Sequence, residues 1–253
     1  MTPYAPDDIN ACAEHLARAD PNRFRAVMAC PVHHRAPLFA LFAMNSEIAQ
    51  APWASQEPMI CEMRLQWWFD ALDDIALGKS VTTHPALSIL SLALDPALAR
   101  RLQTLVTARR WDIYRDPFDT LHDHHTYIRE TSGILFETAA TLLRTNDPKR
   151  ACDMGTAIGA ANFLIALPAL ERAGKIPMTD GRPAAIRDFA NWGQSQIPKH
   201  LDRAGRLACL SGYDAKFTLK RIASDPNVVG DAPPPQNPLL DRLKFLKFAL
   251  IGP

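Results

Sequence analysis

The chain has 253 residues, of which 47% are hydrophobic and 22% are charged, and its formal net charge is +1. This length can build one large domain or two small ones around a substantial core, and the composition is typical of a soluble globular protein. Because the net charge is close to zero, there is no global field to attract nucleic acid, and we expect no nucleic-acid partner.

Nearly every segment of the chain is predicted to be helical. Asp-Pro pairs at residues 20–21, 95–96, 116–117 and 147–148 each supply an N-cap side chain and a residue suited to a first helical turn. Gly78 and Gly174 are predicted to end helices. No segment shows the alternation of a strand. The predicted helices cover residues 7–18, a segment starting at 21, and residues 35–50, 57–77, 87–94, 95–113, 118–143, 148–173, 184–210 and 215–224.

The longest run without charge, residues 154–170, lies at the lower edge of membrane-spanning length. It contains two glycines, an asparagine and a proline, so we interpret it as a core helix of a bundle. The N-terminus shows no apolar secretory segment. The five cysteines are scattered without a C-x-x-C pair, which favours reduced thiols. We therefore expect a cytoplasmic protein.

Residues 1–224 are predicted to form a single helical domain, followed by a proline-rich linker at 225–238 and a C-terminal helix at 239–253. This last helix mixes leucine and phenylalanine with Arg242, Lys244 and Lys247. One interpretation is that it docks its apolar side on the bundle, which we favour because its charges are few. The other is that it lies on an anionic membrane surface, which would make the protein peripheral on a membrane.

Four blocks, in order along residues 20–180, resemble the squalene/phytoene synthase family. The family's active-site entry run is similar to FRAVMACPVHHRAPLFALFAMNSEIA, and a later family segment is similar to RLQWWFDALDDIALGK followed by His84-Pro85. Two further family helices are similar to Tyr127 with TSGILFETAATLL, and to Gly155-x-Ala157 with Asn162. The resemblance implies an all-α, isoprenoid synthase-like helical bundle around a central cavity. Family enzymes condense two prenyl diphosphates head to head there, with Mg²⁺ held by two aspartate-rich motifs.

The sequence departs from the family at the metal-binding positions. Aligned on the family runs, the aspartate positions hold residues without a carboxylate: Ala49, Gln50 and Trp53 in the first motif, and Ala166 and Leu170 in the second. Glu47 is the only carboxylate in the first region. Because a departing diphosphate needs hard cations held by several carboxylates, the resemblance carries the fold but not the catalytic residues. We expect no catalytic residue and no metal or other cofactor.

The particular substitutions point to one branch of the family. AMNSEIAQ followed by EMRLQWW and DDI resembles the branch of complex I assembly factors, which keeps the fold without the aspartate motifs. This resemblance implies a non-catalytic assembly or interaction factor for respiratory complex I. It implies a membrane respiratory complex, or its assembly intermediates, as partner, and leaves room for a lipid or isoprenoid ligand.

Two other functions stay open. The chain could be a head-to-head prenyltransferase that holds Mg²⁺ with displaced carboxylates, namely Glu47, Asp70, Asp73 and Asp74, although a solvated acidic surface explains the last three better. It could also be a soluble prenyl-lipid carrier. The histidines at 33–34 and 122–125 lack the spacing of a zinc site, and we interpret those at 122–125 as a polar helix start.

Eight side chains are candidates for a residual cavity or an internal polar network. Most of them are polar residues set in apolar helical segments, where buried polar groups need partners. Arg64 precedes Trp68 by one helical turn and could lie over its indole, although Trp68 is better explained by core packing. The candidates are Arg35, Asn45, Glu47, Gln50, Arg64, Trp68, Tyr127 and Asn162.

Overall fold

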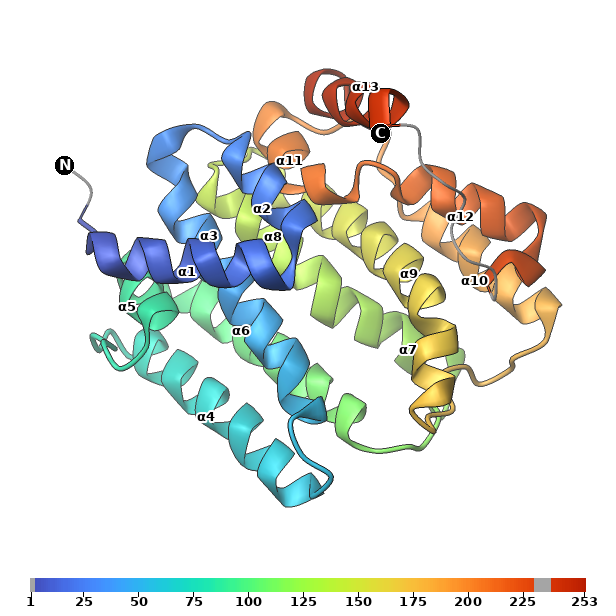
Figure 1. The fold of residues 1–253 in the computed structure, drawn as a ribbon, viewed down its shortest axis with the longest axis horizontal. Coiled ribbons are helices and arrows are strands. Elements are labelled where there is room, and N and C mark those ends of the chain that lie inside the picture. The colour runs from blue at the N-terminus through green and yellow to red at the C-terminus, as the bar shows by residue number, and fades with distance from the viewer. Residues whose placement is uncertain (1–2, 230–237) are drawn as a thin grey trace.

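The computed structural model describes residues 3–229 and 238–253, and all regular elements in these residues are helical (Figure 1). The first half contains α1 (Pro6–Ala19), α2 (Pro21–Met28), α3 (Val32–Gln50), η1 (Ala51–Trp53), α4 (Pro58–Ala76), α5 (Pro85–Ala93), α6 (Pro96–Ala108) and η2 (Arg109–Ile113). The second half contains α7 (Leu121–Ile128), η3 (Arg129–Gly133), α8 (Ile134–Leu142), α9 (Pro148–Arg172), α10 (Pro183–Ser195), α11 (Arg203–Ala208), η4 (Leu210–Gly212), α12 (Ala215–Ser224), η5 (Pro226–Val229) and α13 (Pro238–Leu250).

Most helix boundaries follow from local chemistry. The side chains of Asp20, Asp95 and Asp147 each accept a hydrogen bond from the backbone N–H three residues later, as the Asp-Pro pairs predict. Gly78 and Gly174 end their helices with φ of 76° and 81°, in the left-handed region where glycine carries no steric penalty.

Three predicted boundaries are wrong. Asp116-Pro117 does not begin a helix, because α7 starts four residues later with a reciprocal capping box between Thr120 and Asp123. The predicted helix at 184–210 is two helices, α10 and α11, and Pro198 lies between them. The helix predicted to reach residue 113 tightens into the 3₁₀ turn η2 after residue 108.

α3 and α9 form the centre of the bundle. Residues 36–46 of α3 are buried around the whole helix, since α1, α2, α5 and α8 pack against it. In the described part of the chain, α9 is the one helix whose length and composition would allow it to cross a membrane, and 61% of its most apolar window is buried inside the bundle.

α9 packs tightly against η3, a single π-helical turn between α7 and α8. A Cβ atom added at Gly159 would lie 2.5 Å from Cβ of Ser132, and one at Gly155 would lie 2.7 Å from Cβ of Phe136. This close approach brings Thr131 and Ser132 of the π turn to the side chains of α9.

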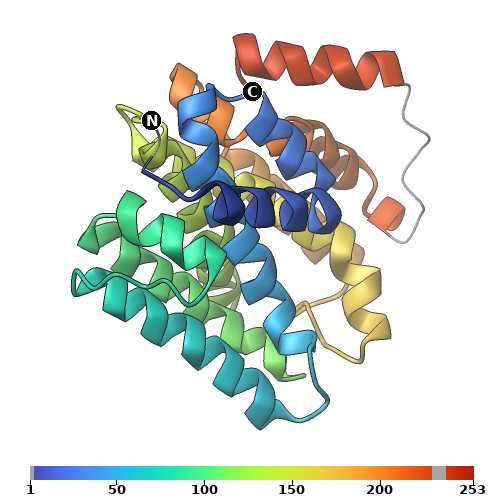
Figure 2. The same ribbon diagram turned by 60° about the vertical axis from the view of Figure 1, so that its left-hand side comes forward.

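α13 and α4 lie at opposite ends of the molecule in both ribbon views (Figures 1 and 2). The predicted division of the chain at residue 224 stays a prediction. Most of the predicted linker, residues 230–237, lies outside the described residues, and the preceding η5 forms a 3₁₀ turn.

Candidate functional site

An inner cavity of about 210 Å³ lies where α2, α3, η1, η2, α7, η3, α8 and α9 meet. Its walls mix aromatic, aliphatic and polar side chains. They include Arg23, Asn45, Trp53, Arg109, Asp112, Tyr127, Ile128, Thr131, Ser132, Leu135, Asn162, Phe163, Ala166 and Leu170.

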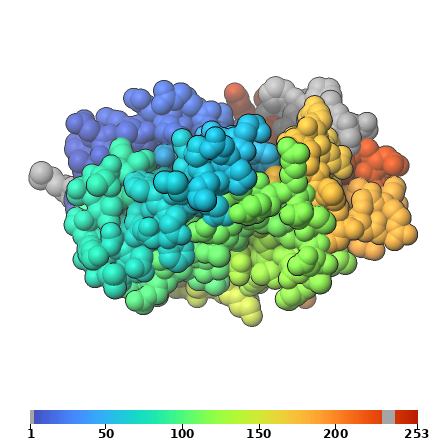
Figure 3. Space-filling model, turned by 90° about the horizontal axis from the view of Figure 1, so that it is seen from below, coloured from blue at the N-terminus to red at the C-terminus, as the bar shows by residue number. Residues whose placement is uncertain are grey.

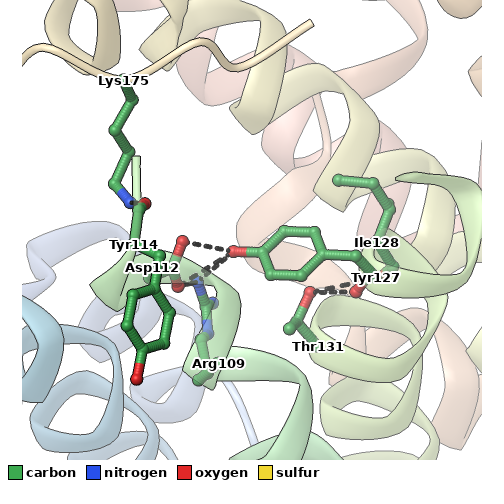
Figure 4. A network of polar contacts seen from close by, with 7 residues as sticks. All are labelled: Arg109, Asp112, Tyr114, Tyr127, Ile128, Thr131 and Lys175. Atoms are coloured by element: carbon green, nitrogen blue, oxygen red, sulfur yellow. Dashed lines mark hydrogen bonds and ion pairs between the residues drawn. The ribbon is translucent and has the colours of Figure 1, made fainter. Parts of the chain in front are cut away.

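A buried polar network centres on Asp112 in this wall (Figure 4). Its carboxylate accepts a hydrogen bond from Nη1 of Arg109 at 3.0 Å and from the hydroxyl of Tyr127 at 2.9 Å. Arg109 Nη1 also donates to the Tyr127 hydroxyl at 2.9 Å. Burial raises the pKa of Tyr127 far above its usual range, so the phenol stays neutral. The one carboxylate of the cavity wall is therefore paired with a cation.

A second arginine enters the cavity from α2. Nε of Arg23 lies 3.4 Å from Asp20, and the guanidinium lies 5.5 Å and 5.7 Å from the ring centroids of Phe42 and Phe136. Burial lowers the pKa of Arg23, Asp20 opposes this effect, and the nearby Arg109 adds to it. Each guanidinium is paired with a carboxylate, Arg23 with Asp20 and Arg109 with Asp112, so both cations of this wall are compensated.

Two buried atoms in this wall have no hydrogen-bond partner in the described part of the chain. They are Oδ1 of Asn45, a residue that is 3% exposed, and Nε of Arg109. Buried polar atoms without partners are rare and costly in native proteins. Asn45 and Arg109 therefore each keep one unsatisfied polar atom beside the inner cavity.

A larger outer groove, of about 750 Å³, shares Trp53 with the inner cavity as a lining residue. Trp67 and Trp68 of α4 line it, and the buried Trp68 ring lies edge-on to His84 at 5.1 Å. Nε2 of His84 lies 3.2 Å from a carboxylate oxygen of Glu47. When the molecule is seen from below, the residues that follow α3 are coloured blue to cyan and lie near the middle of the visible face (Figure 3).

Comparison with known proteins shows which family has this fold. A sequence model of the squalene/phytoene synthase family matches residues 16–180. The chain belongs to the squalene/phytoene synthase family. Two solved structures share the fold of this family member at low sequence identity. A squalene synthase from Alicyclobacillus acidocaldarius gives a TM-score of 0.70 at 16% identity and covers 87% of this chain and 95% of its own. A dehydrosqualene synthase in complex with a ligand gives 0.75 at 14% identity and covers 96% and 95%.

The curated relatives of this protein are described differently from the two solved structures. The proteins named NADH dehydrogenase (ubiquinone) complex I, assembly factor 6, from Homo sapiens and Bos taurus are each 25% identical over 161 residues, covering 62% of this chain and 48% of theirs. The Drosophila melanogaster homolog is 26% identical over 170 residues, covering 62% and 50%. The chain thus spans about half the length of the curated relatives it matches.

The squalene/phytoene synthase family uses Mg²⁺, and the residues of this cavity do not fit that ion. At the family's motif positions, the cavity wall presents the indole of Trp53 and the side chains of Ala166 and Leu170. The Lys175 ammonium lies 5.2 Å from the Trp53 ring and donates to the carbonyl of Tyr114 (Figure 4). Mg²⁺ requires oxygen ligands in a nearly octahedral set, which these groups cannot supply. No cluster of three or more histidine, cysteine or acidic residues suited to a metal occurs among the described residues.

The candidate residues divide between the two hollows. The inner cavity receives Asn45, Tyr127 and Asn162, and the outer groove receives Glu47, Gln50, Arg64 and Trp68. Arg35 lies in neither, because its guanidinium donates to the carbonyls of Met28 and Cys30 and thereby satisfies the end of α2.

The acidic residues of α4 stay outside both hollows. Asp70 and Asp73 are exposed and accept from Gln66 and Gln103, and Asp74 pairs with Lys79. The prenyltransferase alternative requires these carboxylates to converge with Glu47 on one cavity. They do not converge in this structure.

Three charged side chains that line the inner cavity were not predicted from the sequence, namely Arg23, Arg109 and Asp112. Arg109 and Asp112 are spaced as an i, i+3 ion pair, which is a local signal. Their burial depends on Tyr127, which lies 15 residues beyond Asp112 in the chain.

Proposed function

We propose that this protein is a non-catalytic member of its family that assists the assembly of respiratory complex I. The main support for this proposal is that Trp53, Ala166 and Leu170 occupy the positions in the inner cavity where the family has its metal-binding motifs. The names of the curated relatives support the same function, since they describe complex I assembly factors. The partner would be the membrane complex or one of its intermediates, and nucleic acid has no part in this role.

The chemistry of the cavity argues against prenyl transfer. A departing diphosphate carries dense negative charge, which synthases of this fold neutralise with carboxylate-bound Mg²⁺. Here the wall carboxylate, Asp112, is already paired with Arg109 and Tyr127. The cavity volume of about 210 Å³ is also below the range of roughly 300–1,000 Å³ typical of small-molecule sites. Two prenyl diphosphates exceed this space, and we propose that the protein works without a metal cofactor.

If the protein holds a lipid or an isoprenoid, we propose that the hydrocarbon tail of this ligand lies in the outer groove. The groove volume of about 750 Å³ lies within the small-molecule range, and the indoles of Trp53, Trp67 and Trp68 offer it an apolar surface. We also propose that the protein works at the surface of the membrane in which its partner complex is assembled.

The test deletes the gene for this protein in the cells that make it. It then measures the amounts of assembled complex I and of squalene- or phytoene-type hydrocarbon. We expect native gels of solubilised membranes to show less assembled complex I, and the amount of squalene- or phytoene-type hydrocarbon to stay unchanged. Re-expression of the wild-type chain should restore complex I. Unchanged complex I with depleted hydrocarbon would contradict the proposal and favour the synthase. Unchanged complex I with prenyl lipid bound to the purified protein would favour the carrier.

A second measurement uses the purified protein alone. We expect farnesyl diphosphate and Mg²⁺ to give no condensed hydrocarbon, and calorimetry to show no binding of farnesyl diphosphate that a chelator abolishes. Turnover in this assay would show that other residues hold the metal, and the proposal would fail.

A further inference from the structure

α13 is held against the bundle by one face. A carboxylate oxygen of Asp241 accepts a hydrogen bond from Arg25 at 3.2 Å, and the other accepts one from the hydroxyl of Tyr213. The Phe245 ring lies under the Arg25 guanidinium at 4.5 Å and edge-on to Tyr213. Phe248, on the same face, is 3% exposed. These contacts fix the direction in which the rest of the helix points.

The opposite face carries a ridge of exposed aliphatic side chains, which we call the leucine ridge: Leu243, Leu246 and Leu250, flanked by Leu240 and Ile251. The three central leucines follow one another at three- and four-residue spacing, so they share one helix face. The exposed fractions of the five side chains lie between 54% and 72%. Both ribbon views place α13 at the outer edge of the molecule (Figures 1 and 2). A contiguous exposed apolar surface marks a site of interaction.

Basic residues border this ridge on both sides. With 100° per residue, Lys247 and Lys244 lie on one side of the central leucines and Arg242 lies on the other. All three are exposed, and the Lys244 ammonium lies 4.3 Å from the ring of the exposed Phe217 on α12. The long stems of such residues can follow an apolar surface while their charges reach toward phosphates.

The neighbouring helices extend the basic surface. α11, α12 and α13 together contain eight lysines and arginines and one acidic residue, Asp241, whose carboxylate points inward, and three further aspartates, Asp202, Asp214 and Asp225, cap the ends of α11 and α12. α13 packs on α11, and Arg206 of α11 donates to the carbonyl of Ala249 at 3.1 Å. Since the whole chain has a net charge of only +1, positive charge is concentrated at this end of the molecule.

We propose that α13 is a membrane-binding helix that seats the leucine ridge at the headgroup boundary of an anionic bilayer. The bilayer supplies an apolar layer for the leucines and phosphates for Arg242, Lys244 and Lys247. A second copy of the chain fits this surface poorly, because symmetric packing of α13 would oppose these three cations and offer no outward acidic side chain on the helix to pair with them. Thirteen residues span only about 20 Å, so the helix lies in the plane of the membrane.

The test measures co-sedimentation of the whole 253-residue chain with vesicles of phosphatidylcholine, with and without phosphatidylglycerol. We expect binding to the anionic vesicles that weakens as salt is added. The variant L243Q/L246Q/L250Q should bind at least tenfold more weakly. The variant R242Q/K244Q/K247Q should lose about fivefold per charge, or roughly a hundredfold in all.

The matched control is M59Q/M63Q, which removes two exposed apolar side chains from α4 at the other end of the molecule and should bind like the wild type. Absence of wild-type binding, or equal loss in the control and the ridge variant, would overturn the proposal. So would a lipid-free dimer that the ridge variant converts to a monomer. The assay contains no complex I, so its failure leaves the proposed assembly role standing, and failure of that role leaves vesicle binding unchanged.

Discussion

His124 is a fully buried histidine, and neither of its ring nitrogens has a hydrogen-bond partner among the described residues. The rings of Phe118 and Phe189 stack on it, each with its centroid 4.4 Å away, and Phe163 approaches edge-on at 4.5 Å. Burial lowers the pKa of His124 to about 3, and the neighbouring His125 adds to this effect. The ring is therefore a neutral part of the aromatic core, where the sequence pattern favoured a polar helix start.

This burial predicts a pH-dependent stability. The folded-state pKa of His124 lies below the unfolded value of about 6.5, so the unfolded chain binds the proton more tightly. The stabilising effect is complete above pH ~6.5 and is lost at about 1.4 kcal/mol per pH unit as the pH falls toward 3. Urea unfolding should show that H124F flattens this slope, because phenylalanine keeps the stacking and does not titrate.

The control for that experiment is H122F, which removes an exposed histidine two residues away. It should follow the wild-type profile. Parallel loss of stability in H124F and the wild type would show that other groups cause the pH dependence.

Residue identity alone indicated some of the side chains that line the inner cavity. Asn45, Tyr127 and Asn162 were recognisable as polar residues in apolar helices, and all three line the inner cavity. Arg23 and Asp112 were not recognised, because each lies in a short segment with an ordinary share of charge. Their role depends on contacts with distant segments, which a sequence pattern does not record.

At the scale of elements, the packing of α9 on the π turn η3 depends on two glycines one helical turn apart. We expect G159A to lower the free energy of unfolding by about 1–3 kcal/mol, because its Cβ would overlap Ser132. Urea denaturation measures this loss. The matched control is G181A, since a Cβ there meets no atom within 4 Å, and it should change stability by less than about 1 kcal/mol. Equal stability of the two variants would show that η3 yields to the added methyl group.

Local rules succeeded at the elements where one side chain decides the boundary. The N-caps at Asp20, Asp95 and Asp147 needed only the backbone three residues ahead. The rule failed at Asp116, because Thr120 and Asp123 form the stronger, reciprocal cap. The π turn was not predicted because it is coupled to the close approach of another helix.

At the scale of the whole molecule, the predicted division after residue 224 can be tested by truncation. A chain that ends at Val229 should keep its helical circular dichroism and a single cooperative urea transition. Its free energy of unfolding should fall by about 2–4 kcal/mol, because the truncation exposes the surfaces that Phe245 and Phe248 cover. The ridge variant L243Q/L246Q/L250Q should unfold like the wild type, since its side chains are exposed. Loss of cooperativity in the truncated chain would show that α13 belongs to the domain.

The all-α class and the family fold could be predicted because helix signals and four ordered blocks agreed along the chain. The shapes of the two hollows could not. The inner cavity draws on side chains from Arg23 to Leu170, and its volume depends on how eight elements pack. Substitutions at the metal positions were visible in the sequence, but only the structure shows that the Trp53 ring lies 5.2 Å from the Lys175 ammonium.

One residue of η1 belongs to both hollows. The Trp53 side chain lines the inner cavity and also the outer groove, and it is about half exposed. A change in the rotamer of this one indole would therefore alter the shape of both hollows at once.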